Sequence, residues 1–504
     1  MGTWPIPYLK GRSLVRTTTD RKFMNQHQQA LIKLTAVQAT TALRLRNISA
    51  EEYLEAYIAQ IETVNPTINA VVTKNFERAR QEASAAQKQL DRARDHGALL
   101  GLPILIKDNQ LTAGIRTTLG SKMYAGQIPA RDAGIVNRIR HAGGIIIGKT
   151  NIPELSIGAN TVNTLFGATC NPFAESLTCG GSSGGSAAAI ASNMAALATG
   201  SDHGGSLRIP ASFCGVVGFR ATPGIVPNEE RTITQTNYSL QGPISRNIGD
   251  AGLLMSVIAQ RDRSALNDPM AFPFDSSQFS PLPDIDPGQL RVAYSEDLGG
   301  LTVSAQIRHL FRAKTAQMSH LFKLSEDHPI DLTEAPAADW ALRQDVFATQ
   351  YYDQRDQWGK DMNPNVLSTY DAALKTPLLD VAKARRKQIE LYREFSRIFD
   401  HFDLLIIPGV SVMPFPWSEM YPEQIDGEVV TNYMAWLGLS SSLTVIGHPV
   451  AAIPCGLDAQ GTPFGLQLIG KPFEDAKLLT MAQAIETALN GIPALSRPVS
   501  PYSY

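Results

Sequence analysis

The chain has 504 residues, of which 43% are hydrophobic and 18% charged, a composition that excludes a disordered or fibrous protein. Its 45 basic and 47 acidic residues give a net charge of −2, without the basic runs interleaved with aromatic residues that mark a nucleic-acid binder, so we expect no nucleic-acid partner. Four cysteines without a CxxC pair argue against a disulfide scaffold, and nine histidines without an HExxH motif argue against a metal site.

The amino-terminal segment, 1–30, is polar and lacks a hydrophobic repeat, which predicts a tail or a strap on the surface. The first residues lack the apolar core of a signal peptide, and the chain has no run of about 18 apolar residues that would span a membrane. We therefore expect a cytoplasmic protein that does not enter the membrane. Ser49 and Glu52 form a capping box that predicts the start of a helix, and the composition of residues 75–96 predicts a second one.

The rest of the chain favours one α/β domain over residues 31–504. From 101 to 260, short apolar runs that end in glycine alternate with alanine-rich stretches, which is typical of strands and helices in an α/β sheet. Residues 304–400 predict helices with exposed charges. Strand-like runs then return at 404–408, 448–454 and 464–470. Strands on both sides of the helical part predict a single sheet with a variable, mostly helical insertion around 300–440, which we expect to form the substrate pocket.

Two clusters of glycine and serine stand out within the α/β part. The first, GGSSGGS at 180–186, has the composition of a flexible linker, but the alanine-rich run 187–191 follows at once and predicts a helix start. It is not a phosphate-binding Walker loop, because no Gly-Lys-Ser/Thr sequence closes it. The second cluster, DHGGS at 202–206, places Ser206 between a strand-like run and a predicted helix.

Lys107 follows the apolar run LPILI, which places it at the end of a buried strand rather than on a solvated face. Burial in apolar surroundings lowers the pKa of a lysine, and a neutral amine is a competent base. The unobstructed backbone N–H groups of Gly204 and Gly205 suit a developing oxyanion. Together these features indicate nucleophilic catalysis.

An ordered set of motifs resembles the amidase signature family. It comprises GLPILIKDN at 101–109, GKTNIPE at 148–154, CGGSSGGSAAAIA at 179–191, GSDHGGSLRIPASFCGVVGFRATPG at 200–224, GPISRNIGDAGLL at 242–254, and the carboxy-terminal GHPVAAIP and GTPFGLQLIGKPFEDAKLL. The similarity extends with interruptions from about 34 to 487. The resemblance implies one α/β domain with a central mixed, largely parallel sheet surrounded by helices. Many relatives are homodimers, so it also allows a homodimer.

The resemblance also implies a catalytic triad. Ser206 matches the family's nucleophile, Ser182 matches a bridging serine that follows a cis peptide bond, and Lys107 matches the base. The backbone N–H groups that correspond to the oxyanion hole are those of His203, Gly204, Gly205 and Ser206. A serine relay of this kind replaces histidine and requires no cofactor.

Further residues around the triad are expected to support it. Ser183 is expected to support the site through its hydroxyl. Asp202 and Arg208 are expected to hold the nucleophile loop by an ion pair or hydrogen bonds. His203 stands where the family more often has a small or apolar residue. In one interpretation only its backbone matters. In the other its imidazole contacts the leaving group or, when charged, depresses the pKa of Lys107.

For the substrate, the sequence favours a small or medium-sized amide with an apolar or aromatic acid part, cleaved to the acid and ammonia or an amine through an acyl-enzyme on Ser206. The candidate substrate-binding residues are Asn237, Tyr238, Tyr352 and Trp436. Two alternatives share the triad: a hydrolase of carbamates, aryl acylamides or ureas, and an amidotransferase A-type subunit. Against the latter, Ile209 stands before Pro210 where that subgroup usually has a polar residue. A catalytically silent scaffold is disfavoured because all three triad positions are intact.

Overall fold

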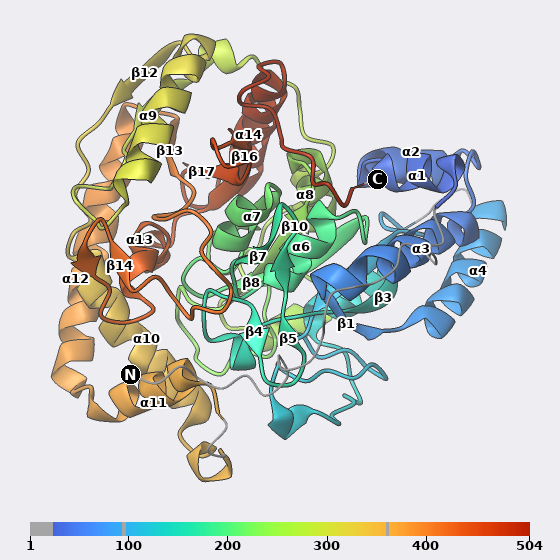
Figure 1. The fold of residues 1–504 in the computed structure, drawn as a ribbon, viewed down its shortest axis with the longest axis horizontal. Helices are drawn as coiled ribbons and strands as arrows, with labels where there is room; N and C mark the ends of the chain where they lie inside the picture. The colour runs from blue at the N-terminus through green and yellow to red at the C-terminus, as the bar shows by residue number, and fades with distance from the viewer. Residues whose placement is uncertain (1–23, 93–96, 359–361, 504) are drawn as a thin grey trace.

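The computed structural model describes residues 24–92, 97–358 and 362–503, and these form a large sheet with helices around it (Figure 1). The sheet has eleven strands. In spatial order they are β1 (Val71–Lys74), β3 (Ile145–Thr150), β2 (Pro103–Lys107), β8 (Leu197–Asp202), β10 (Leu240–Ser245), β9 (Val217–Arg220), β16 (Val450–Leu457), β17 (Pro463–Ile469), β13 (Leu404–Pro408), β11 (Arg291–Tyr294) and β12 (Leu324–Asp327).

This architecture confirms the predicted single α/β domain with a mixed sheet. Parallel pairing extends over two stretches, β3–β2–β8 and β13–β11–β12. The strands between these stretches pair antiparallel, and so does β1 at the edge. The parallel character that the resemblance implies is therefore confined to those two stretches. Strands from before and after the helical part of the chain meet where β9 pairs with β16.

Helices cover the sheet and its two ends. They are α1 (Gln26–Lys33), α2 (Ala36–Arg44), α3 (Ala50–Ile68), α4 (Phe76–Arg92), α5 (Gly134–His141), α6 (Gly184–Ala191), α7 (Arg208–Cys214), α8 (Ile248–Ile258), α9 (Ala305–Met318), α10 (Ala335–Tyr351), α11 (Pro364–Lys375), α12 (Leu378–Ser396), α13 (Gly438–Ile446) and α14 (Asp475–Asn490). Three short hairpins lie outside the main sheet: β4 (Val162–Asn163) with β5 (Gly167–Ala168), β6 (Cys170–Asn171) with β7 (Ala174–Thr178), and β14 (Gln424–Ile425) with β15 (Glu428–Val429). Figure 1 shows α3 and α4 at one end of the molecule and α10 to α12 at the other.

The two predicted amino-terminal helices are present. The Ser49 capping box starts α3, and α4 occupies the second predicted segment up to Arg92. The predicted tail of residues 1–30, however, extends too far, because the helix α1 already begins at Gln26. The Asn25 side chain caps that helix, and Leu31 and Ile32 bury its apolar side in the core. Residues 1–23 of the predicted tail lie outside the described residues.

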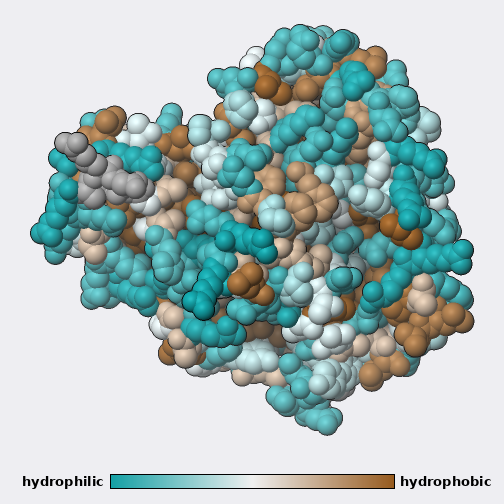
Figure 2. Space-filling view, turned by 180° about the vertical axis from the view of Figure 1, so that it is seen from behind, coloured by the Kyte–Doolittle hydropathy of each residue, from teal (hydrophilic) through white to brown (hydrophobic). Residues whose placement is uncertain are grey.

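Hydrophilic and hydrophobic side chains are interspersed on the face that Figure 2 shows. Among the described residues, no helix combines the length and the apolar character that crossing a membrane requires.

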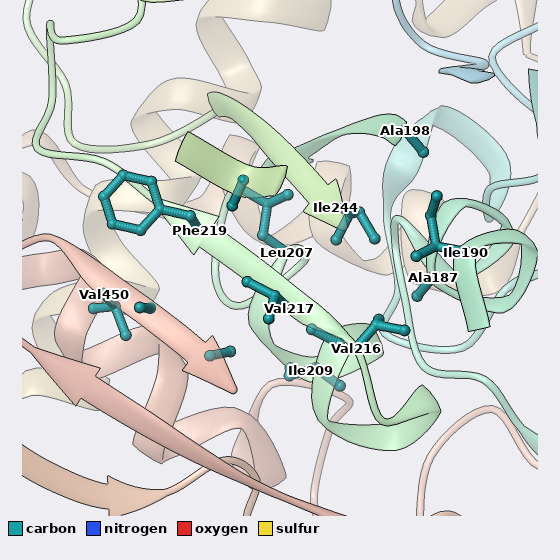
Figure 3. Packing of buried hydrophobic residues seen from close by; sticks show 14 of the residues in the cluster. Ala187, Ile190, Ala198, Leu207, Ile209, Val216, Val217, Phe219, Ile244 and Val450 are labelled. Atoms are coloured by element: carbon teal, nitrogen blue, oxygen red, sulfur yellow. The ribbon is translucent and has the colours of Figure 1, made fainter. Parts of the chain in front are cut away.

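The central helices α6 and α7 are buried along their whole length. They pack against each other, and α7 also packs against β9, β16 and β17. Figure 3 shows Ala187, Ile209 and Val217 among the buried side chains of this region. Because close packing leaves few alternative positions for the backbone, the turns that precede α6 and α7 are held firmly. These are the turns that carry the two serines of the predicted triad.

Candidate active site

The three residues of the predicted triad lie on three adjoining elements. Lys107 is the last residue of β2, Ser182 lies in the turn before α6, and Ser206 lies in the turn between β8 and α7. Lys107 is fully buried, and its Nζ donates hydrogen bonds to Ser182 Oγ over 2.7 Å and to Ser183 Oγ over 2.8 Å. It also donates to Ser201 Oγ over 2.9 Å. The lysine therefore ends in a shell of hydroxyl groups, and one of these belongs to the predicted bridging serine.

The peptide bond between Gly181 and Ser182 is cis, as the resemblance implies. Glycine is required before it, because a Cβ at position 181 would lie 2.9 Å from the carbonyl carbon of Ala159. Ser182 is buried, yet it lines the same pocket as the partly buried Ser206. Within the described residues, no hydrogen bond joins the hydroxyls of these two serines, so the step from Ser206 to Ser182 stays a prediction.

Burial lowers the pKa of Lys107 from its ordinary value to about 7, and the negative charge of Asp202 opposes this shift. At that pKa a substantial fraction of the amine is neutral near neutral pH and has a lone pair that accepts a proton. The direction of this shift agrees with the expectation from the apolar run that precedes Lys107. The hydrogen bond to Ser182 and the lowered pKa of Lys107 thus fit the predicted role of a base.

Asp202 organises the turn that carries Ser206. Its buried carboxylate forms ion pairs with Arg208 over 2.9 Å and with Arg220 over 3.1 Å. It also accepts the backbone N–H groups of Gly205 and Leu207. The two arginines hold the pKa of Asp202 well below its ordinary value against the effect of burial, so the carboxylate is charged. The predicted loop-holding contact between Asp202 and Arg208 is present.

Arg220 is a supporting residue that sequence reasoning missed. It ends β9, is fully buried, and donates to the backbone oxygens of Asp202 and Asn237. The only signal in the sequence is an arginine at the end of the apolar run VVGF, because a charge in a buried strand requires a partner.

The backbone donors at the nucleophile turn are not equivalent. Gly205 has a positive φ of 128°, and its N–H already binds Asp202 over 2.9 Å. For the N–H groups of His203, Gly204 and Ser206, no acceptor is present among the described residues. The predicted oxyanion hole therefore narrows to these three groups, and Gly205 instead supplies the backbone turn that presents them.

The imidazole of His203 is partly buried and lies 3.0 Å from Ser239 Oγ through Nδ1, with its ring centroid 4.7 Å from that of Tyr238. Burial, followed by the charges of Arg343 and Arg220, lowers the pKa of His203 well below its ordinary value. The ring is neutral near neutral pH, which argues against the interpretation in which a charged imidazole depresses the pKa of Lys107.

A pocket of about 200 Å³ opens in front of Ser182 and Ser206. Segments 155–159, 228–241 and 433–437 contribute to its wall, together with one side of α10. Its lining combines apolar and aromatic side chains with many polar and charged ones. The charged and aromatic residues of this lining include Glu230, Arg231, Arg343, Phe347, Tyr351 and Tyr433.

Of the four predicted substrate-binding residues, only Tyr238 lines this pocket. Asn237 is turned away, because its side chain donates to the backbone oxygen of Val445. Tyr352 is 72% exposed, since it lies one residue beyond the end of α10. Trp436 is 1% exposed and packs against Phe213. The structure therefore does not place these three residues in the pocket. For Tyr352 and Trp436 the reason is that an aromatic side chain does not reveal from the sequence which way it faces.

The structure also reveals a second buried lysine. Lys149 on β3 is fully buried, and its pKa is lowered to about 7 by burial. Its Nζ donates to the backbone oxygen of Gln110 and to Thr112 Oγ1, and it does not line the pocket. A lowered lysine pKa alone is therefore not specific to the candidate site. Contact with the pocket serines distinguishes Lys107.

Comparison with known proteins shows similarity over nearly the whole chain. Residues 52–479 match the family described as Amidase. The chain is 33% identical to the A-type subunit of the glutamyl-tRNA(Gln) amidotransferase of Moorella thermoacetica, covering 90% of this chain and 96% of that protein. It is 30% identical to an acylamidase of Rhodococcus erythropolis, covering 91% and 96%. A solved bacterial aryl acylamidase of the amidase signature family superposes with a TM-score of 0.83 at 27% identity, covering 92% and 99%.

Proposed function

Because this chain belongs to the amidase signature family and is an amide hydrolase of that family, we propose that it cleaves a small or medium-sized amide with an apolar or aromatic acid part, through an acyl-enzyme on Ser206. The observation that carries this proposal is the hydrogen bond from Lys107 to Ser182 in the wall of the pocket that Ser206 lines. Phe347 and Tyr351 on α10 give the pocket an aromatic wall that suits such a substrate.

The proposed mechanism uses the three side chains in turn. Neutral Lys107 accepts the proton of Ser182, while Ser182 accepts the proton of Ser206 after the latter turns toward it. Ser206 Oγ then forms a bond with the amide carbonyl carbon. The negative charge moves to the carbonyl oxygen, where the free N–H groups of the nucleophile turn stabilise it.

The tetrahedral intermediate collapses when its carbon–nitrogen bond breaks. The relay returns one proton to the leaving nitrogen, so ammonia or an amine departs and an ester on Ser206 remains. Water then attacks that ester through the same relay. Its oxygen forms the acid, and its proton restores the serine hydroxyl. No step requires an electron carrier.

The two alternatives remain distinct proposals. Carbamates, aryl acylamides and ureas present the same carbonyl carbon to Ser206, and an acylamidase and an aryl acylamidase are among the similar proteins. An amidotransferase A-type role is favoured by the similarity to a protein of that name. In that role the chain would pass the ammonia to another protein rather than release it into solution.

The isolated chain is expected to hydrolyse members of a panel of primary amides, anilides, carbamates and ureas, because its pocket and triad lie within one domain. Acid and amine release would be measured by chromatography, and the ranking of kcat/KM identifies the bond that is preferred. Turnover only after a partner protein is added would favour the amidotransferase alternative instead. Equal rates with heat-denatured protein would contradict enzymatic hydrolysis.

The rate should rise with pH across neutrality. Below the pKa of about 7 Lys107 is protonated and has no lone pair, whereas above it the amine is neutral and accepts a proton. We therefore expect kcat/KM to increase along an acidic limb with a midpoint of about 7. The control is His203→Thr, whose acidic limb should superimpose on that of the wild type because the imidazole is already neutral. A pH-independent rate across this range would contradict the role of Lys107.

A further inference from the structure

Arg343 is a charged residue in the pocket wall that the proposed mechanism does not use. It lies on α10 and lines the pocket with Ser182 and Ser206. Its side chain is 8% exposed, so the guanidinium is almost completely removed from water. A buried charge is costly unless it has partners, so the partners of this group decide its role.

The contacts of the guanidinium leave part of it unsatisfied. Nη2 donates to the Tyr433 hydroxyl over 2.8 Å, and Nη1 contacts the sulfur of Met434. The carboxylate of Asp339 lies 3.9 Å from Nη1, beyond hydrogen-bond distance. Nε is buried and has no acceptor among the described residues.

Asp339 is directed to a different partner. Its Oδ1 accepts the hydroxyl of Tyr238 over 2.8 Å. The nearest carboxylate therefore does not form the paired hydrogen bonds that a buried guanidinium usually makes with an acid. By contrast, Arg231, the other arginine in the pocket wall, is directly paired with Asp268 over 3.0 Å.

Arg343 is also close to the reacting end of the pocket. An ideal Cβ built on Gly204 would lie 3.9 Å from Nη1, which places the guanidinium beside the turn that carries Ser206. The described lining residues include two arginines, Arg231 and Arg343, but one acid, Glu230. The Glu230 carboxylate lies 3.5 Å from the guanidinium of Arg131. A ligand whose carbonyl carbon is next to Ser206 would therefore extend past an incompletely paired cation.

We propose that Arg343 is a specificity-determining residue that binds a carboxylate on the acyl part of the substrate. The preferred substrate is then an amide whose carboxylate lies a short distance from its carbonyl carbon, because the guanidinium lies beside the turn that carries Ser206. This inference rests on the proposed amide hydrolysis and adds the charge of the substrate to it. The planar guanidinium suits a carboxylate, because its N–H groups match the spacing of the two oxygens.

The test compares substrates in matched pairs. One series consists of straight-chain primary amides, and the other consists of amides of the same lengths that carry a terminal carboxylate. The wild type should prefer the carboxylate member of the best pair by about tenfold or more in kcat/KM, because a hydrogen bond between charged groups is stronger than one between neutral groups.

Arg343→Met should lower kcat/KM for that carboxylate substrate by about 10- to 100-fold and change the rate on its uncharged match by less than about threefold. Arg343→Lys keeps the charge and should retain part of the preference. The matched control is Arg385→Met, because Arg385 is an exposed arginine on α12 that does not line this pocket, and it should behave like the wild type. Thermal unfolding of each variant shows whether it is folded.

The outcomes separate the two proposals. If the wild type hydrolyses neither series, the proposed function fails. If it hydrolyses both series equally well, or if Arg343→Met lowers both rates to the same extent in a folded protein, the inference about Arg343 is wrong while amide hydrolysis stands. Should Arg343→Met fail to fold, the wild-type preference and the Arg343→Lys variant decide.

Discussion

The Ser206→Ala variant is expected to lose amide turnover, with kcat falling by about 10⁴-fold or more, because removal of a catalytic serine hydroxyl abolishes the covalent route. The same variant should no longer react with a fluorophosphonate probe, which labels an activated serine. Both losses follow from the position of Ser206 in the pocket wall beside Ser182. The measurements are steady-state hydrolysis of the best amide and mass spectrometry of the probe-treated protein.

The matched control is Ser212→Ala. Ser212 is a buried serine on α7 whose hydroxyl donates to the backbone oxygen of Arg208, so its removal leaves no side-chain partner unsatisfied. This variant should keep both turnover and labelling. Probe labelling that persists in folded Ser206→Ala would assign the nucleophile to another residue.

The second large effect is expected at Lys107. Lys107→Met should lower kcat by about 10²- to 10⁴-fold, the usual contribution of a general base. Lys107→Arg should be impaired to a similar extent, although it keeps the positive charge, because a guanidinium does not lose its proton in a protein. The arginine variant therefore separates a lysine that accepts a proton from one that only contributes charge.

Lys149→Met is the control for the loss of a buried lysine. Lys149 has a pKa lowered to about 7 as well, but its contacts are Gln110, Thr112 and Thr117 rather than the pocket serines. Whatever stability Lys149→Met loses, the folded fraction should retain probe labelling. Full activity in Lys107→Met would refute the relay, and stability measured by thermal unfolding excludes misfolding as the reason for a loss.

The candidate triad was predicted from the resemblance of an ordered set of motifs, and the local signals agree with it. Ser206 and Ser182 each lie in a turn between glycines and a helix, and Lys107 ends an apolar strand. Parallel neighbours β2 and β8 then place Lys107 beside the strand that leads to Ser206, a proximity that follows from the sheet itself. The ion pair of Asp202 with Arg208 was predictable for the same reason, since six positions along one turn separate the two residues.

The pocket was much less predictable. Its wall combines α10, the loop 228–241 and residues 433–437, which are brought together only by the tertiary fold. Tyr352 and Trp436 are of a residue type that often lines pockets, yet Tyr352 faces solvent and Trp436 is buried in the core. Arg343 gave no signal, because a single arginine in a helix with exposed charges is indistinguishable from a surface residue until its surroundings are known.

The Asp202 carboxylate joins a turn, a helix and a strand through buried charges, so the fold itself holds the turn that carries Ser206. Arg343, which we propose to select the ligand, lies instead on α10, a helix that belongs to a different part of the chain. Natural or laboratory selection for a new amide can therefore change residues of α10 and leave the turn that carries Ser206 intact. Mutant libraries directed at the α10 residues that line the pocket are therefore the shortest route to a changed substrate preference.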